Sequence, residues 1–228
     1  MYTLSTTEDV FKFETSLSLA RLQTYINYAG PEKALELYIW NARISAAFLL
    51  PLQIYEVVIR NAVAEALVYQ RGEQWPWSVG FQRSLPKLQR NALMEVLEHP
   101  RRKPKTADDV IAAMKFFFWE SFFTARMKKR FWDAYLFVVF PGLDREKDVG
   151  EWVKQIAGEI DQIRTLRNRI AHHEPIFRSP LRQDYDLIFG LINARCCVTA
   201  DWMDLHQDVL TLLSEGEGLL NKEKGKLI

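Results

Sequence analysis

The chain of 228 residues contains only two cysteines, and these are adjacent, as Cys196 and Cys197. Neighbouring cysteines rarely bond to each other, because the peptide between them must distort. The sequence therefore excludes a disulfide framework of the kind that stabilises small secreted proteins. Both cysteines lie in an apolar run, and we expect them to be buried as small hydrophobic side chains.

The sequence also lacks the common motifs that hold metal ions and nucleotides. It contains no Cys-x-x-Cys and no His-Glu-x-x-His, and its four histidines are His99, His172, His173 and His206. Glycine-rich phosphate loops of the P-loop and dinucleotide-binding types are absent as well. We therefore expect a protein that uses neither a metal ion nor an organic cofactor.

Long apolar runs without charge are missing too. No window of 18 residues is both apolar and free of charged side chains, so we expect no transmembrane helix. Residues 1–9 contain neither a basic group nor an apolar stretch, which is unlike a secretory signal. The expected location is the cytoplasm, without a membrane partner.

Glycine is scarce, with ten residues, and clear strand alternation between turn signals is hard to find. Apolar residues recur at helical spacing nearly everywhere, so the expected fold class is all-α. We predict one helical domain over residues 1–213, with an aromatic-rich helical insertion in 116–139. Residues 214–228 are predicted to form a polar, fraying tail.

Proline, glycine and capping residues set the expected helix boundaries. Helices are predicted over residues 6–28, 31–49, 52–69, 86–98, a stretch after Thr106, two segments within 115–139, 144–172 and 181–213. Pro51 is expected to kink the chain or to separate two helices. Asp144 is expected to cap the long helix that follows it, and Thr106 with Asp109 to form a capping box.

Residues 163–175, IRTLRNRIAHHEP, form the segment richest in side chains that suit catalysis or phosphate binding. On a helical wheel the apolar residues of 152–170 form a buried stripe. Arg164, Asn168 and His172 align at i, i+4 and i+8 on another face. The sequence thus places an imidazole, an amide and a guanidinium in one row near the end of a helix.

These side chains suit the cleavage of RNA without a metal ion. Histidine transfers protons near neutral pH, and arginine stabilises charge that develops on a phosphoryl group. A base would take the proton of the 2′-hydroxyl, whose oxygen then attacks the adjacent phosphate. A structural role is the alternative, because a histidine just before the helix-ending Pro175 can cap the last carbonyls.

Residues 167–172, RNRIAH, resemble the R-N-x-x-x-H motif of HEPN ribonucleases. The longer phrase LRNRIAHHEPI, residues 166–176, resembles the signature of the Abi-like abortive-infection proteins in that superfamily. Two other stretches fit the same family, EVVIRN at 56–61 and FFFW at 116–119. The resemblance extends from about Leu17 to Asp201.

The resemblance implies a helical bundle of HEPN type that dimerises along the motif helices, so that both protomers contribute to one cleft. It makes Arg167 and His172 the catalytic pair, supported by Asn168, with His173 as the alternative imidazole. Because Arg167 and His172 are about 140° apart on an ideal helix, they do not converge within it. A cleft between two copies, or a helix that unwinds before Pro175, would bring them together.

Further supporting or RNA-binding candidates are Arg164, Arg169, His173, Glu56, Arg60 and Asn61. Glu56 and Arg60 are four residues apart and form either an ordinary surface pair or a support for the motif helix. In the second case Glu56 would reach Arg167 or Arg164.

The function that the resemblance implies is a metal-independent endoribonuclease that leaves a 2′,3′-cyclic phosphate. Its setting would be bacterial anti-phage abortive infection or a toxin–antitoxin system. Expected partners are RNA, a second copy of the chain, and an antitoxin protein or small RNA. A non-catalytic RNA-binding or protein-interaction module, or a simple helical dimerisation protein, would share the same scaffold.

Charge is balanced over the whole chain and uneven locally. With 30 Lys and Arg against 29 Asp and Glu, the net charge is +1, which argues against coating of nucleic acid. Residues 164–182 nevertheless contain five arginines against one acid. The basic runs at 101–105 and 126–130 are either phosphate contacts or solvated surface. Trp75, Trp77 and Trp119 are expected in the core, with base stacking as the alternative.

Overall fold

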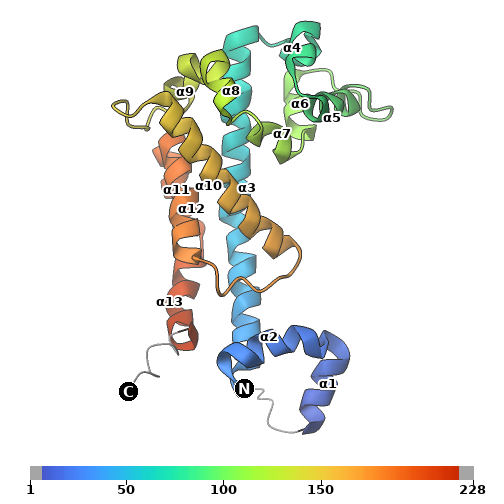
Figure 1. Ribbon diagram of the computed structural model, residues 1–228, viewed down its shortest axis with the longest axis vertical. Coiled ribbons are helices and arrows are strands. Elements are labelled where there is room, and N and C mark those ends of the chain that lie inside the picture. Colours follow the sequence, from blue (N-terminus) through green and yellow to red (C-terminus); the bar gives the residue numbers. More distant parts are fainter. Residues whose placement is uncertain (1–6, 221–228) are drawn as a thin grey trace. The chain divides into compact units, whose positions relative to one another are not determined.

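The computed structural model describes residues 7–220, and this part of the chain is all-α, without a strand, as predicted (Figure 1). Contacts divide the chain into two compact units. The first contains residues up to Leu52, Ile163–Asp186 and the chain from Leu205 onward. The second contains Gln53–Gln162 and Leu187–Asp204. Each unit therefore combines segments that are distant in the sequence.

The first unit is made of helices from both ends of the chain and from the motif region. It contains α1 (Thr7–Leu17), α2 (Leu19–Ala29), the first part of α3 (Ala34–Arg71), the end of α10 (Val149–Ala171), the start of α11 (Leu181–Arg195) and α13 (Val209–Leu220).

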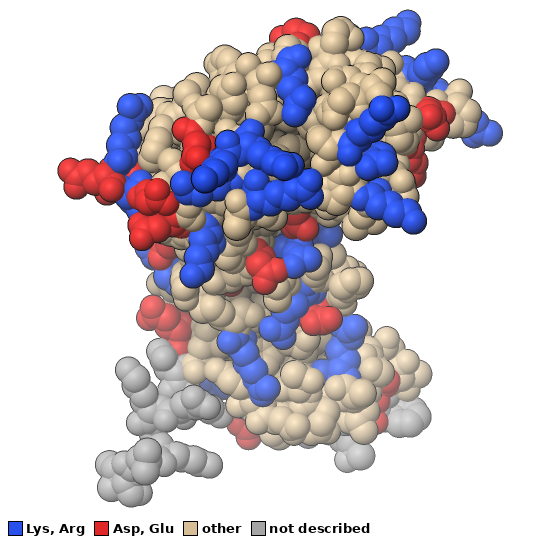
Figure 2. All heavy atoms as spheres, turned by 45° about the horizontal axis from the view of Figure 1, so that its top comes forward, with Lys and Arg blue, Asp and Glu red and all other residues tan. Residues whose placement is uncertain are grey.

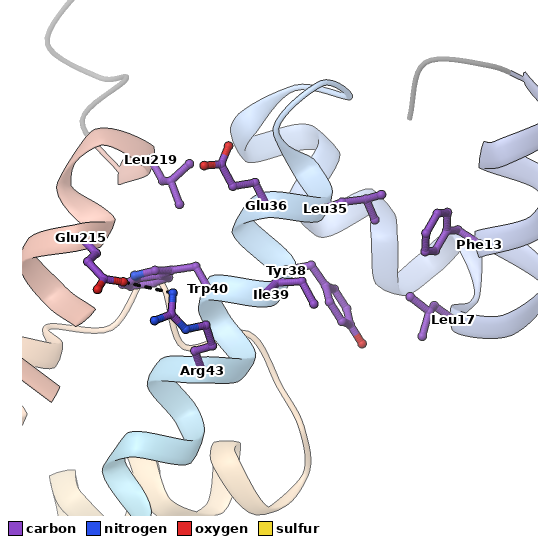
Figure 3. Close-up of a pocket in the computed structure, with 10 residues that line it drawn as sticks. All are labelled: Phe13, Leu17, Leu35, Glu36, Tyr38, Ile39, Trp40, Arg43, Glu215 and Leu219. Atoms are coloured by element: carbon purple, nitrogen blue, oxygen red, sulfur yellow. Dashed lines mark ion pairs between the residues drawn. The ribbon is translucent and has the colours of Figure 1, made fainter. Parts of the chain in front are cut away.

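Helix α3 packs closely against α13 in the first unit. The indole Nε1–H of Trp40 donates to the carbonyl of Leu212 at 2.8 Å. A Cβ atom built at Gly216 would lie 2.4 Å from the Trp40 ring, so only glycine permits this approach. Arg43 and Glu215 form an ion pair at 3.0 Å between the same two helices (Figure 3).

Substitution of Gly216 by alanine should destabilise the protein by about 1–3 kcal/mol, because the buried Trp40 ring has no room to move away. Gly218→Ala is the matched control, since a Cβ there meets no atom within 4 Å. Alanine at this exposed helical position should stabilise α13 by up to about 1 kcal/mol. Urea denaturation measures both, and equal effects of the two substitutions would contradict the packing argument.

The second unit contains the remainder of α3 and most of the short helices. These are a 3-10 helix (Trp75–Trp77), α4 (Val79–Ser84), α5 (Lys87–Leu97), α6 (Ala107–Ala113), α7 (Phe116–Glu120), α8 (Ala125–Met127), a π-helix (Lys128–Trp132) and α9 (Asp133–Val139). The unit also takes most of α10, the end of α11 and most of α12 (Cys197–His206).

Aromatic rings fill much of the core of the second unit. Its largest fully buried side chains include Trp75, Trp119, Trp132, Tyr55, Phe118, Phe122, Phe131 and Phe140. The indole of Trp132 donates to the carbonyl of Phe122 at 2.8 Å. The predicted burial of Trp75 and Trp119 is thereby confirmed, whereas Trp77 is only half-buried. The aromatic-rich segment builds the centre of this unit.

Two predicted details of local structure are confirmed. Helix α5 covers the segment predicted at 86–98. Thr106 Oγ1 accepts from the backbone N–H of Asp109 at 3.2 Å, and Asp109 Oδ2 accepts from Thr106 N–H at 2.9 Å, which completes the capping box. Hydrogen bonds from the backbone N–H groups of Lys105 and Thr106 hold the pKa of Asp109 below its usual value.

Several predicted boundaries are wrong near the N-terminal end. The helix expected over 6–28 is divided, because Ser18 takes a φ of 66°, which a right-handed helix does not allow. Pro51 lies inside the continuous helix α3 rather than between two helices. Phe48 and Leu52 on either side of the proline are buried, and their packing favours the helix against the roughly 3 kcal/mol that an internal proline costs.

The start of α10 and the aromatic-rich segment also differ from expectation. Asp144 Oδ1 accepts from Glu146 N–H at 2.9 Å and so closes a turn, and Asp148 accepts from Gly150 N–H at the actual helix start. Residues 115–139 form three short α-helices and a π-helix instead of two helices. The buried rings in this segment dictate where the backbone must turn.

The C-terminal prediction of one helix over 181–213 and a fraying tail is also wrong. The chain forms α11, α12 and α13, and Gln207 Oε1 accepts from Leu210 N–H at the start of α13. Residues 214–220 remain helical because Gly216 and Leu219 are buried. Residues 221–228 of the predicted tail lie outside the described part of the chain.

The two cysteines are exposed and unbonded, so their predicted burial is wrong. They lie at the junction of α11 and α12, where the chain turns and the apolar run does not continue into the core. Hydrogen bonds with Thr199 lower the pKa of the Cys196 thiol.

Helix α3 has the length and apolar composition of a membrane-crossing helix when up to two charged residues are allowed in the window. An 18-residue window within it, with at most two charged residues, has a mean hydropathy of 1.5, and 33% of this window is buried. Core helices of water-soluble proteins meet the same criteria. Among the described helices, α3 alone does so.

Candidate functional site

The motif residues lie on the last two turns of α10, in the first unit. Arg164, Arg167, Asn168 and His172 are all exposed, whereas Ile163, Leu166 and Ile170 are buried. The backbone N–H of His172 still donates to Asn168 at 2.9 Å, so His172 keeps the helical register. The predicted row of Arg164, Asn168 and His172 on one face of the helix is therefore confirmed.

The helix ends immediately after this row in a left-handed turn at His173. Its φ is 55°, a conformation in which glycine is the usual residue. The N–H of His173 donates to Ile170 at 3.0 Å and that of Glu174 to Arg169 at 2.8 Å, the two bonds of a Schellman motif. The helix does not unwind before His172, so the expected convergence of Arg167 and His172 by unwinding does not occur.

Two arginines hold this turn in place. Arg169 Nη2 donates to the carbonyl of Pro175 at 2.8 Å, and its Nε lies 3.5 Å from the Glu174 carboxylate. Arg21, on α2, donates to the carbonyl of His173 at 2.6 Å. Arg169 therefore positions the segment that follows the motif. Its guanidinium, which the sequence indicates as a candidate for RNA binding, is engaged in these contacts. Nothing in the sequence around Arg21 indicates its role.

The segment after the turn is anchored by Asn41 on α3. The side chain is buried, and its Oδ1 accepts from the backbone N–H groups of Ile176 at 2.8 Å and Phe177 at 3.2 Å. Asn41 follows a buried tryptophan in an apolar helix, and this polar interruption is the only signal that the sequence offers for it.

Arg167 and His172 do not meet along one helix. Arg167 Nη1 lies 3.4 Å from Asn168 Oδ1, at the upper limit of a hydrogen bond. With His172 in helical register, the two side chains leave α10 about 140° apart. A catalytic arrangement of the two therefore needs another element, and a second copy of the chain remains our prediction.

The phrase at residues 56–61 lies on the part of α3 that belongs to the second unit. Arg60 Nε lies 3.4 Å from Asn61 Oδ1. Asn61 is exposed, and Glu56 and Arg60 are half-buried. Both readings of Glu56, as a surface partner of Arg60 and as a support for the motif helix, stay predictions.

A pocket of about 400 Å³ adjoins the turn at the end of α10. Its lining includes Ala171, His173, Arg21, Tyr25, Tyr38 and Asn41. The rings of Tyr25 and Tyr38 lie 4.9 Å apart. Burial and the neighbouring Tyr38 raise the pKa of Tyr25 from 10 to about 12, so its hydroxyl stays protonated into strongly alkaline solution. The pocket has the size of a small-molecule site, and the rings of Tyr25 and Tyr38 form part of its wall.

A larger pocket of about 650 Å³ lies between α1, α3 and α13 of the same unit (Figure 3). It is lined mainly by apolar side chains, among them Phe13, Leu17, Ile39 and Leu219. None of the motif residues lines it. The Arg43–Glu215 ion pair closes one side.

Within residues 7–220, no three His, Cys, Asp or Glu side chains are grouped as metal ligands would be. Comparison of the chain with protein-family models, with curated proteins and with solved structures gives no match. The relation to Abi-like and HEPN proteins therefore depends on the motif phrases alone.

Replacement of Asn41 by alanine should destabilise the protein by about 1–3 kcal/mol for each buried N–H group that loses its acceptor. Ser45→Ala, one turn further along α3, is the control. Its hydroxyl donates to the Asn41 carbonyl, which is already part of the helix, so the loss should stay below about 1 kcal/mol. Urea denaturation gives the two energies, and faster hydrogen exchange at Ile176 and Phe177 locates the defect. Wild-type stability of the alanine variant would contradict the anchor.

Proposed function

We propose that the protein is a metal-independent endoribonuclease of the Abi-like HEPN type. The observation that carries the proposal is the exposed row of Arg164, Asn168 and His172 beside Arg167 at the end of a rigid helix. The Schellman turn and its arginine contacts hold the helix end, so the His172 backbone is fixed before substrate binds. The resemblance supplies the setting, which is defence against phage or a toxin–antitoxin pair.

In the proposed reaction His172 acts as the general base. It takes the proton of a ribose 2′-hydroxyl, and the 2′-oxygen forms a bond to the adjacent phosphorus. Arg167 stabilises the added negative charge with its planar guanidinium. The bond from phosphorus to the 5′-oxygen breaks, and an imidazolium donates a proton to that oxygen. The products are a 2′,3′-cyclic phosphate and a 5′-hydroxyl end.

A homodimer provides the missing geometry. Two motif helices that lie side by side would place Arg167 of one copy opposite His172 of the other, which the 140° separation on one helix prevents. His173 at the turn would then donate the proton to the leaving group.

Three of the other arginines near the motif have contacts within the protein. Arg169 is engaged with Glu174, Arg182 pairs with Asp186 at 3.0 Å, and Arg178 lies over the Tyr28 ring at 5.4 Å. Arg164 and Arg167 are exposed on the last two turns of α10, and we assign them to contacts with the RNA backbone. We assign the neighbouring 400 Å³ pocket to a base that flanks the scissile phosphate.

Purified protein incubated with total RNA in excess EDTA should produce fragments that end in 2′,3′-cyclic phosphate. His172→Ala should reduce the rate by about 10²–10⁴-fold because the base is lost. His206→Ala, which removes another exposed histidine, should retain wild-type activity. RNA binding without cleavage would favour the non-catalytic module, and neither activity would favour a helical interaction protein. A need for a divalent metal would contradict the mechanism.

Mixing two inactive variants tests the shared cleft. Arg167→Ala and His172→Ala proteins mixed in equal amounts under subunit exchange should recover about a quarter of wild-type activity. Half of the dimers are then mixed, and each mixed dimer has one intact site. No recovery, although mass measurement shows mixed dimers, would place Arg167 and His172 of one chain in the same site.

A further inference from the structure

A separate pocket of about 400 Å³, in the second unit, combines basic and apolar side chains. Its floor is apolar, with Phe81 and Phe122 both almost fully buried. Three arginines from different elements reach it, Arg71 at the end of α3, Arg126 on α8 and Arg130 on the π-helix. No aspartate or glutamate is among the residues that line it.

The charge of these three arginines is not balanced by an ion pair. Two other cations of the unit are paired: Lys128 lies 3.2 Å from Asp133, and Arg195 contacts Glu65. Among the described residues no carboxylate lies within salt-bridge distance of the pocket arginines. Arg71 is held over the Phe81 ring at 5.4 Å instead. Figure 2 shows Lys and Arg side chains gathered in the upper part of the face in view.

The backbone around the pocket is built to hold one of these arginines. Arg130 belongs to the π-helix, a rare form that is found frequently at functional sites. The Gln70 side chain donates to the Arg130 carbonyl at 2.5 Å and joins the π-helix to α3. Phe131 and Trp132, which follow Arg130, are buried in the aromatic core. Arg130 is thus exposed on a segment whose neighbours are fixed.

Polar groups between the arginines complete the pattern. Ser84 Oγ donates to the Phe81 carbonyl and Ser121 Oγ donates to the Phe118 carbonyl, both at 2.6 Å. Each hydroxyl donates its hydrogen to a backbone carbonyl. Its oxygen, which lines the pocket, can therefore act only as an acceptor for a ligand. The pocket therefore combines guanidinium donors for an anion, acceptors for N–H or O–H groups, and an apolar floor.

We propose that this pocket binds a free nucleotide. Guanidinium forks match phosphate oxygens, the apolar lining at Pro86 and Met127 packs against a base, and the serine oxygens accept from sugar hydroxyls or base N–H groups. The volume lies within the range of small-molecule sites. In this proposal the basic run at 126–130 contacts the phosphate groups of the nucleotide. The proposal uses no residue of the α10 motif and holds whether or not the protein cleaves RNA.

Binding of ADP, GDP and UDP to the full chain, measured by titration calorimetry, tests the proposal. The double variant Arg126→Ala/Arg130→Ala should weaken the Kd of the preferred nucleotide by about tenfold or more, since two charge-assisted contacts are lost. The matched control is Arg101→Ala/Arg102→Ala, which removes the same charge from an exposed turn of the same unit and should change the Kd less than about twofold. Ser84→Trp blocks the pocket without a change of charge and should abolish binding.

Three comparisons decide the outcome. Equal weakening in both double variants would overturn the proposal, because it would show a general charge effect. Pyrophosphate that binds as tightly as the nucleotides would overturn the nucleotide site, because it would show that the apolar floor adds nothing to binding. Binding of a 2′-O-methyl hexanucleotide, which the proposed cleavage cannot attack, without binding of free nucleotides would assign the surface to an RNA strand and overturn a nucleotide site.

Discussion

The carboxamide oxygen of Asn41 accepts two buried backbone N–H groups, and the geometry of the motif region depends on this contact. Ile176 and Phe177 lie just after Pro175, where the chain reverses, and their amides have no helical partner. A buried N–H without an acceptor costs enough to open such a segment. With the anchor in place, the turn at His173 is fixed from one side by α3 and from the other by Arg21. The imidazole of His172 thus extends from a backbone that is defined on both sides.

Arginine has two different roles in this protein. Arg169 and Arg195 hold backbone carbonyls and carboxylates together, Arg169 after the motif and Arg195 between Val139 and Glu65. Arg126 and Arg130 reach a pocket without a carboxylate beside them. The net charge of +1 conceals this division, since a sum over the chain cannot tell a paired cation from one that faces a cavity. Only the positions of the partners separate the two groups.

The sequence predicted the local features that depend on neighbouring residues. The capping box at Thr106 and Asp109 and the extent of α5 follow from side chains within a few positions. Features set by distant packing were missed. Pro51 stays within α3 because buried neighbours outweigh its lost hydrogen bond, and α13 extends beyond residue 213 because Gly216 faces the Trp40 ring. The exposed cysteines were missed for the same reason, since an apolar run does not reveal where a helix ends.

For the candidate site, the sequence by itself determined the row of Arg164, Asn168 and His172, because the helical period fixes which side chains share a face. It also determined that Arg167 points elsewhere on the same helix. The tertiary structure decided that the helix stays intact to its last residue and that the chain then reverses in a left-handed turn. A histidine at that position does not predict such a turn. Arg21 and Asn41, which lie far away in the sequence, supply the hydrogen bonds that stabilise it.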